Sequence, residues 1–216
     1  MGRTGELLFE TPPNYFLLYF MAESSRPHGW GVNMIHQGTR EIHTDRLILR
    51  RFTIDDASEM LDRWADDAEV TQFLSWQPHG TIEVTKAVVN DWVNAYSFLN
   101  VYHWGIVYDN QLIGSISLLQ PNDELAEAEA GYCLSRAFWG KGIMAEALLS
   151  AVIDYAFTEV GLQRIHAKHD IRNPNSGKVM QKCGMKYIET AERPLALKPD
   201  RIKICDCYEI LNTNRS

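Results

Sequence analysis

The chain has 216 residues, of which 45% are hydrophobic and 23% are charged, and its formal charge is −7. This usage is ordinary for a globular protein and excludes collagen-like, disordered and membrane-embedded chains. The 28 acidic residues outnumber 21 basic ones, which argues against a nucleic-acid partner, because phosphate contacts need a basic surface. An acidic balance suits a cationic or amine-bearing substrate, and the length predicts one domain, or one domain with an appendage.

The beginning of the chain lacks a sustained helical or strand period and is rich in proline and glycine. We therefore expect an irregular extension at residues 1–40 and a single domain at 41–216, with Met34 as an alternative translation start. The longest apolar run, Tyr15 to Met21, is too short to span a bilayer, and acidic residues precede it, unlike in a signal peptide. We expect a cytoplasmic protein with no membrane partner.

Hydrophobic periodicity predicts alternating helices and strands from Arg46 onward. The spacing of Thr53 and Asp56 resembles a capping box and indicates that a helix starts there. Asp109-Asn110-Gln111 separates two extended segments and predicts a hairpin turn. The expected elements of this half are a strand at 46–52, a helix at 57–64, a helix at 81–96, and strands at 104–108, 112–119 and 126–134.

The second half contains the strongest helical pattern, at 143–160, with Gly161 as its end. A strand at 164–169 follows, and then a helix with Asn173 as N-cap, Pro174 at the first helical position and Gly184 at its close. We expect two closing strands, at 185–191 and 202–211, separated by a loop that holds Pro194 and Pro199. This order predicts a mixed α/β (α+β) domain.

The four cysteines form no CxxC pair, which indicates a reducing compartment and no disulfide framework. Cys205 and Cys207 would share one face of a strand, but no histidine lies near them in the sequence. His166 and His169 are three apart on a predicted strand, so they point to opposite faces and cannot chelate together. We expect no metal.

Candidate chemistry is concentrated in the segment from Ser135 to Met144, between a strand and the strongest helix. Gly140 and Gly142 let the backbone approach a ligand closely, and the free N–H groups of a helix start can hold phosphate. The spacing fits neither a Walker loop nor a dinucleotide fingerprint. A tight turn before a helix is the plain alternative.

Several blocks, in this order, resemble the Gcn5-related N-acetyltransferase (GNAT) family, and more narrowly the branch that acetylates the N-termini of ribosomal proteins, with its small-molecule relatives. Together they span most of the chain between Arg46 and Leu211. The blocks are Thr44-Asp45-Arg46-Leu47-Ile48-Leu49-Arg50, Glu129-Ala130-Gly131-Tyr132-Cys133-Leu134, Trp139-Gly140-Lys141-Gly142-Ile143-Met144-Ala145-Glu146-Ala147, and Asn173-Pro174-Asn175-Ser176 followed by Lys182-Cys183-Gly184-Met185.

The resemblance implies a mixed, mostly antiparallel sheet that splays between its fourth and fifth strands, with a bulge in the fourth, flanked by about four helices. It implies acetyl-CoA as the acyl donor, with the pyrophosphate on the backbone from Gly140 to Ala145 and the pantetheine arm beside the fourth strand. Cys133 would be a packed side chain and not a nucleophile, since the amine attacks the thioester directly. The implied cofactor-binding residues are Cys133, Leu134, Trp139, Gly140, Lys141, Gly142, Ile143, Met144, Ala145, Asn173 and Ser176.

Direct attack requires a neutral amine, so a general base must accept a proton. The resemblance points to Glu129, although a solvated strand-edge glutamate is the alternative and Glu127 shares its face. Many relatives protonate the departing thiolate with a tyrosine in the slot that is Met180 here. Because methionine cannot protonate the thiolate, this role is expected to fall to Ser176. The alternative is that Ser176 is only a residue of the first helical turn.

The resemblance implies an amine acceptor, which is either a protein N-terminus or a small molecule such as a polyamine, an amino acid or an aminoglycoside. The acceptor pocket is expected at residues 75–80, 102–104 and 194–200, with Trp76, Trp104 and Tyr132 as an aromatic wall. Two alternatives to this enzyme stay open: a catalytically weak acyl-CoA-binding protein and a docking partner of another protein. A homodimer stays open as well.

Overall fold

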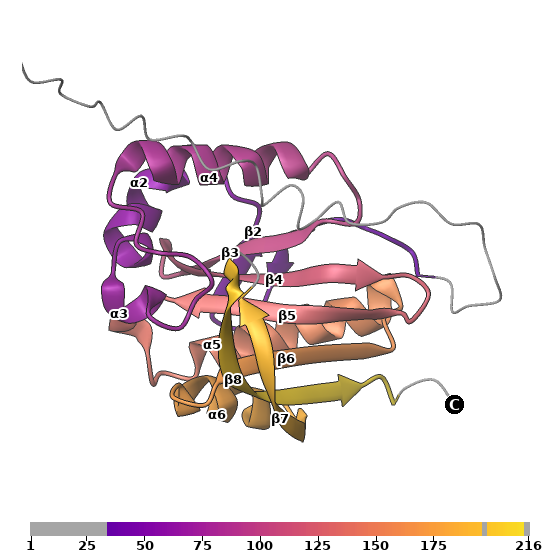
Figure 1. The fold of residues 1–216 in the computed structure, drawn as a ribbon. Helices are drawn as coiled ribbons and strands as arrows, with labels where there is room; N and C mark the ends of the chain where they lie inside the picture. Colours follow the sequence, from indigo (N-terminus) through magenta and orange to yellow (C-terminus); the bar gives the residue numbers. More distant parts are fainter. Residues whose placement is uncertain (1–33, 196–197, 214–216) are drawn as a thin grey trace, which may run out of the picture.

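The computed structural model describes residues 34–195 and 198–213. An eight-stranded sheet in the order β1-β2-β3-β4-β5-β6-β8-β7 forms its centre (Figure 1). Among the described strands, β5 and β6 run parallel and the other neighbours are antiparallel. The mixed, mostly antiparallel sheet is therefore confirmed. The strands are β1 (Ile42–His43), β2 (Leu47–Arg50), β3 (Tyr102–Tyr108), β4 (Gln111–Asn122), β5 (Glu127–Leu134), β6 (Arg164–Asp170), β7 (Lys186–Leu195) and β8 (Lys198–Leu211).

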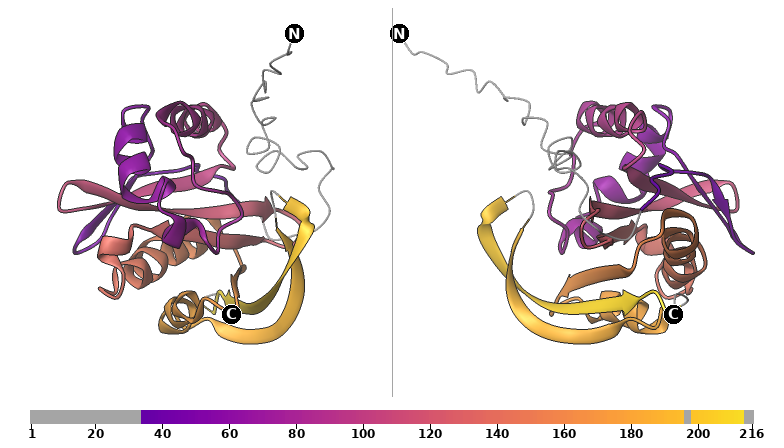
Figure 2. Two further views of the ribbon diagram at one scale, coloured as in Figure 1. Left: turned by 60° about the vertical axis from the view of Figure 1, so that its left-hand side comes forward. Right: turned by 90° about the vertical axis from the view of Figure 1, so that its right-hand side faces the viewer.

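Helices cover both faces of the sheet (Figures 1 and 2). One face carries α2 (Asp56–Met60), its π-helical continuation η1 (Leu61–Ala65), and α4 (Ile82–Ala95), and the short α3 (Ala68–Thr71) follows η1. The other face carries a long helix that begins as α5 and continues with π-helical turns, and the shorter α6. These are α5 (Ile143–Glu146), η3 (Ala147–Ile153), η4 (Ala156–Val160) and α6 (Pro174–Lys182), with the 3₁₀ turn η2 (Arg136–Phe138) before α5.

Each face of the sheet has its own apolar core, because side chains alternate between the faces along a strand. On β4, Ile113 belongs to the core under α5 and η3, whereas Leu112 belongs to the core under α2 and α4. Trp104 of β3 is fully buried in the first core, and Trp64 of η1 is fully buried in the second. Sheet and helices thus form three layers around two cores.

The structure confirms most of the predicted elements and lengthens the last two. Asp109 and Asn110 adopt positive φ values of 50° and 57° in the hairpin turn between β3 and β4, as a two-residue turn of this kind requires. The predicted loop with Pro194 and Pro199 is wrong, because β7 includes the first proline and β8 includes the second. Both lie at the tip of the β7–β8 hairpin, and β7 is an edge strand, where proline is tolerated. Sequence periodicity missed the two short elements β1 and α3.

Residues 34–40, which fall in the predicted extension, carry no helix or strand but lie against the domain. The Ile35 amide donates to the Val160 carbonyl at 2.9 Å, and the Gly38 amide donates to the Leu99 carbonyl at 2.7 Å. The indole N–H of Trp104 donates to the Arg40 carbonyl at 2.6 Å. This segment therefore connects the long helix, the turn after α4 and strand β3.

Two predicted absences can be compared with the described residues only. Within these residues, no helix is both long and apolar enough to cross a membrane. No group of three or more histidine, cysteine or acidic side chains there is arranged to hold a metal ion. The four cysteines are free thiols.

The first helix begins at a carboxylate that binds both backbone and side-chain groups. Asp56 accepts two hydrogen bonds from the Arg50 guanidinium, each 2.8 Å long, and one from the Thr53 amide at 2.7 Å. A capping box has two hydrogen bonds, and the one from the Thr53 amide to the Asp56 carboxylate is formed. The other is not, because the Thr53 hydroxyl donates to Asp56 instead of accepting from a backbone amide. Burial disfavours the charged form of Asp56, yet the hydrogen bonds from Arg50 and Thr53 outweigh burial and lower its pKa.

Replacing Asp56 by Asn should lower the free energy of unfolding by about 2–3 kcal/mol, because it leaves the half-buried Arg50 without its counter-charge. Since the pKa of Asp56 is lowered in the folded protein, its contribution is complete above about pH 4 and is lost as the pH falls further. Urea unfolding at neutral and at acidic pH measures both effects. Asp62→Asn, at an exposed position of η1, is the control, and an equal loss in both variants would contradict this account.

Candidate active site

The central feature of the site is the divergence of β5 from β6. The two strands pair in parallel register only from Glu127 to Glu129, opposite Arg164 to His166. Both strands continue, to Leu134 and Asp170 respectively, without further pairing between them. The expected splay is therefore confirmed. The expected fourth and fifth strands are β5 and β6, because β1 was not predicted. The bulge expected in the fourth strand lies instead on the neighbouring β4, where Gln120 and Pro121 together oppose Ala128 between the pairs Leu119–Glu129 and Asn122–Glu127.

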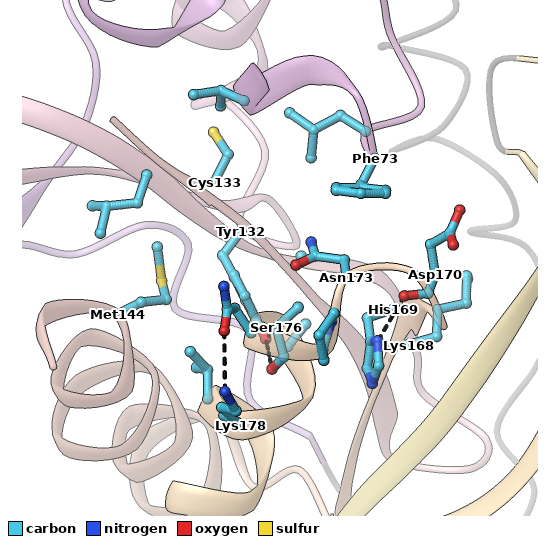
Figure 3. A pocket seen from close by; sticks show the side chains of 18 of the residues that line it. Phe73, Tyr132, Cys133, Met144, Lys168, His169, Asp170, Asn173, Ser176 and Lys178 are labelled. Carbon is cyan, nitrogen blue, oxygen red and sulfur yellow. Dashed lines mark hydrogen bonds between the residues drawn. The ribbon is translucent and has the colours of Figure 1, made fainter. Parts of the chain in front are cut away.

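A cavity of about 600 Å³ occupies this divergence. Its walls come from the segment after α3, from β5, from the loop before α5, from the end of β6 and the start of α6, and from β7 and β8. In Figure 3, Cys133 and Met144 lie at one side of the cavity, Tyr132 and Asn173 near its middle, and Phe73 and Asp170 at the other. The cavity thus joins segments that are distant in the sequence, such as those of Phe73 and Lys203, which are 130 residues apart.

The loop before α5 is built as the glycine spacing predicts. Gly140 and Gly142 have φ values of 74° and 76°, which favour glycine, and a Cβ atom at either position would meet no atom within 4 Å. Ile143 begins α5 directly after Gly142, so the free N–H groups of the first turn lie at the cavity wall. This open backbone can accommodate an anionic group.

Two other residues of this loop, Trp139 and Lys141, make side-chain contacts within the protein. The Trp139 indole N–H donates to the Leu134 carbonyl at 2.8 Å, so this carbonyl already has a partner within the protein. The ammonium of Lys141 lies 4.8 Å from the centre of the Phe138 ring and Lys141 does not line the cavity, whereas Ile143, Met144 and Ala145 do.

Cys133 is a packed thiol beside the cavity. Its sulfur lies 3.3 Å from the Ser115 hydroxyl, and burial raises the pKa of the thiol. A raised pKa disfavours the thiolate, which is the nucleophilic form of cysteine. Cys133 therefore lacks the environment of a nucleophile.

Two hydroxyl groups meet at the start of α6. The Tyr132 hydroxyl lies 3.0 Å from Ser176 Oγ and 3.2 Å from the Ser176 carbonyl oxygen, to which it donates (Figure 3). Both residues line the cavity. Met180, in the slot where many relatives have a tyrosine, is buried in the core. The phenol hydroxyl that contacts the start of α6 therefore comes from β5.

Asn173 occupies the N-cap position of α6, as predicted, but its side chain makes no capping hydrogen bond. Instead it lines the cavity near its middle (Figure 3). The expected side-chain cap is therefore wrong. The backbone holds this turn, because the Asn173 amide donates to the Asp170 carbonyl at 2.7 Å and the Ser176 amide donates to the Asn173 carbonyl at 3.2 Å.

Glu129 lies where the two strands separate, and it lines the cavity. Its carboxylate is 2.5 Å from the Lys168 ammonium and 3.8 Å from His166 Nε2. Burial lowers the pKa of His166 despite the nearby carboxylates. The neighbouring Glu127 binds Arg164 at 3.1 Å and does not line the cavity.

Sequence patterns did not identify the residues at the far side of the cavity. Asp170 is almost fully buried and accepts two side-chain hydrogen bonds from Arg172, at 2.9 and 2.6 Å. The Lys203 ammonium lies 3.9 Å from the same carboxylate and donates to the Phe73 carbonyl at 3.0 Å. Phe73 could not be identified as a cavity residue from the sequence, because the helix α3 just before it was not predicted. Arg172 and Lys203 are distant in the sequence and meet at Asp170 only because β6 and β8 are neighbours in the sheet.

The predicted aromatic wall is not formed. Trp104 is fully buried in the core under α5, and Trp76 packs on His79 with ring centres 5.0 Å apart. Neither tryptophan lines the cavity, whereas Tyr132 does. The aromatic residue opposite Tyr132 is Phe73, whose ring lies 5.9 Å from the Arg172 guanidinium carbon. Of the predicted acceptor segments, 75–80 and 194–200 reach the cavity at Ser75 and Pro194, and 102–104 lies in the core. The side chains of 195–200 lie outside the described residues.

Comparisons with known proteins agree with this geometry. A family model described as an acetyltransferase (GNAT) domain matches residues 46–186. The uncharacterized N-acetyltransferase p20 of Bacillus licheniformis is 31% identical over 142 residues, which cover 64% of this chain and 78% of the relative.

Solved structures show the same fold at lower identity. The ribosomal-protein-S5-alanine acetyltransferase of Vibrio fischeri superposes with a TM-score of 0.69 at 20% identity, covering 82% of this chain and 99% of that one. The microcin C7 self-immunity acetyltransferase MccE, solved with acetyl-CoA and AMP, gives 0.67 at 18% identity, covering 78% and 93%. The family match over most of the chain and the splayed sheet show that the chain belongs to the GNAT family and is an acyl-CoA-dependent N-acetyltransferase.

Proposed function

We propose that this enzyme transfers an acetyl group from acetyl-CoA directly to a primary amine, and that the N-terminal amine of a protein is the acceptor to test first. The observation that carries the proposal is the single cavity that runs between the diverging strands, from the glycine loop to the Asp170 cluster. A cavity of this extent can hold a donor and an acceptor together at one reaction centre.

The cavity lining fits the anionic donor. Six of its side chains are cationic and three are acidic, in a chain whose formal charge is −7. Lys178 and Lys182 of α6 belong to the cationic set and line the same cavity as Gly140 and Gly142. The pyrophosphate would lie on the backbone of Gly140 to Ala145. The cationic residues are Lys168, Arg172, Lys178, Lys182, Arg193 and Lys203, and the acidic ones are Glu69, Glu129 and Asp170.

Glu129 is the general base of this proposal. It lies at the point of divergence with a carboxylate that lines the cavity, so it can accept a proton from the amine directly or through water. Lys168, at 2.5 Å, orients this carboxylate. The acceptor enters from the side of Phe73 and Asp170, and Tyr132 lies between that side and the donor.

The acceptor is identified by incubating the protein with acetyl-CoA and a mixed panel of short peptides, polyamines, amino acids and aminoglycosides. Free thiol reports turnover, and the mass of the products reports which amine is acetylated. Acetylated peptide N-termini support the full proposal. Acetylation of only a small-molecule amine overturns the protein acceptor and keeps the transfer chemistry.

Placing a carboxylate at Gly142 should weaken acetyl-CoA binding. We expect Gly142→Asp to raise the dissociation constant at least about tenfold above that of Gly142→Asn, because only the former places a negative charge against the pyrophosphate. Both side chains tolerate the left-handed backbone at this position, so the pair isolates charge from backbone strain. Titration calorimetry measures the affinity. Equal dissociation constants for the two variants would contradict the assignment of pyrophosphate binding to this segment.

Removing the Glu129 carboxylate should slow the reaction without loss of the donor. Glu129→Gln is expected to lower kcat by about 10²-fold or more and to change its pH dependence, with an unchanged dissociation constant for acetyl-CoA. Glu127→Gln is the matched control, since it removes the neighbouring glutamate on the same face, outside the cavity. A wild-type pH profile in Glu129→Gln would assign the base to another group.

A further inference from the structure

Lys168 places a primary amine of the protein against the proposed general base. It follows His166, the last residue of β6 that pairs with β5, by two positions, so the two side chains share one face of the strand. The Lys168 ammonium is 2.5 Å from the Glu129 carboxylate, and these side chains are 31% and 15% exposed. Both residues line the cavity, and Figure 3 shows Lys168 on the Asp170 side of it. The protein's own amine therefore lies where an acceptor amine has to lie.

The other lysines of the described cavity lining make different contacts. Lys178 donates to an asparagine side chain of its own helix at 3.4 Å, and Lys203 donates to a backbone carbonyl at 3.0 Å. Lys182 is exposed in the last turn of α6. The contact with Glu129 therefore distinguishes Lys168 from the rest of this set.

This contact supplies what a lysine needs to attack a thioester. Only a neutral amine is nucleophilic, and Glu129 touches the ammonium directly, so it can accept a proton without an intervening water. The lysine side chain has a flexible four-carbon stem, so its nitrogen can turn from the carboxylate to a neighbouring carbonyl carbon. With the donor held in the same cavity, the reaction is intramolecular, which favours it strongly over reaction with free lysines.

We propose that this protein acetylates its own Lys168 when acetyl-CoA is bound without an acceptor. The inference rests on the proposed use of acetyl-CoA and of Glu129 as the base. Glu129 accepts the first proton of the ammonium, and the neutral nitrogen forms a bond to the thioester carbon. The carbon–sulfur bond breaks with its electron pair on sulfur, and the second proton leaves the nitrogen for sulfur or water. The products are an amide at Lys168 and coenzyme A, with one proton released.

Acetylation of Lys168 changes the site and ends the reaction. It removes the positive charge that pairs with Glu129. It stops after one acetyl group on this side chain, because an amide nitrogen is no longer a nucleophile. An acceptor amine and Lys168 compete for one carboxylate, so the modified lysine marks enzyme that has met the donor without an acceptor.

Mass spectrometry tests this inference without any acceptor. The full chain is incubated with saturating acetyl-CoA near neutral pH and digested with a protease that does not cleave at lysine. We expect one acetyl group on Lys168, added at least about tenfold faster than on Lys86, an exposed lysine of α4 that reports uncatalysed acetylation. The rate constant should not depend on protein concentration, since the transfer occurs within one chain.

Paired variants separate a catalysed transfer from general lysine reactivity. Lys168→Arg keeps the positive charge but offers no acceptor amine, so it should lose the fast acetyl group. Lys178→Arg is the matched control, because it replaces another lysine of the cavity lining, and it should keep this group. Glu129→Gln should slow the acetylation of Lys168 at least about tenfold, whereas Glu127→Gln, outside the cavity, should not.

Titration calorimetry of acetyl-CoA binding distinguishes failure of this inference from failure of the proposed function. Binding to the wild-type protein with Lys168 acetylated no faster than Lys86 overturns the inference and leaves the proposed function standing. A Lys168 rate that is unchanged in Glu129→Gln, or that rises in proportion to protein concentration, overturns the inference as well. Acetyl-CoA that does not bind to the wild-type protein overturns the proposed function and the inference together.

Discussion

The site depends on the point where β5 and β6 stop pairing. Beyond Glu129 and His166, the facing edges of both strands carry backbone groups without a strand partner, although each strand stays paired on its other side with β4 or β8. Such groups need partners, which a ligand or water can supply. The sheet thereby provides a slot with hydrogen-bonding walls, and the two cores on its faces keep the walls apart.

Charged contacts between distant segments fix the shape of this slot. Asp170 at the end of β6 binds Arg172 and lies near Lys203 of β8, and Lys203 also binds the backbone of the segment after α3. On the donor side, Arg136 before the glycine loop pairs with Asp67 at the N-cap of α3, 3.0 Å away. The segment around α3 is therefore tied to both ends of the cavity. Because Asp170 is buried, its pairing costs desolvation and gives a defined geometry in return.

Sequence patterns predict local features well here and long-range contacts poorly. The hairpin turn at Asp109 and Asn110 and the glycine conformations of the loop before α5 follow from local chemistry, and both are present. The position of Trp104 could not be predicted, because an aromatic residue on a strand gives no sign of which layer it faces. The Asn173 cap was a sound local expectation, but the side chain lines the cavity instead. Contacts such as Tyr132 with Ser176 require knowing that β5 and the start of α6 face each other.

The charge of the whole chain is also a poor guide to the site, for a physical reason. At physiological ionic strength the Debye length is about 8 Å, so exposed charges further away than this are largely screened at the cavity. The acidic excess of the chain is summed over its entire length, whereas the described cavity lining has six cationic side chains against three acidic ones. The groups that a bound molecule meets are therefore of the opposite sign to the net charge. An acidic composition argues against a protein that follows a phosphate backbone along its surface, but it does not forbid a small basic cavity that holds one phosphate-bearing molecule.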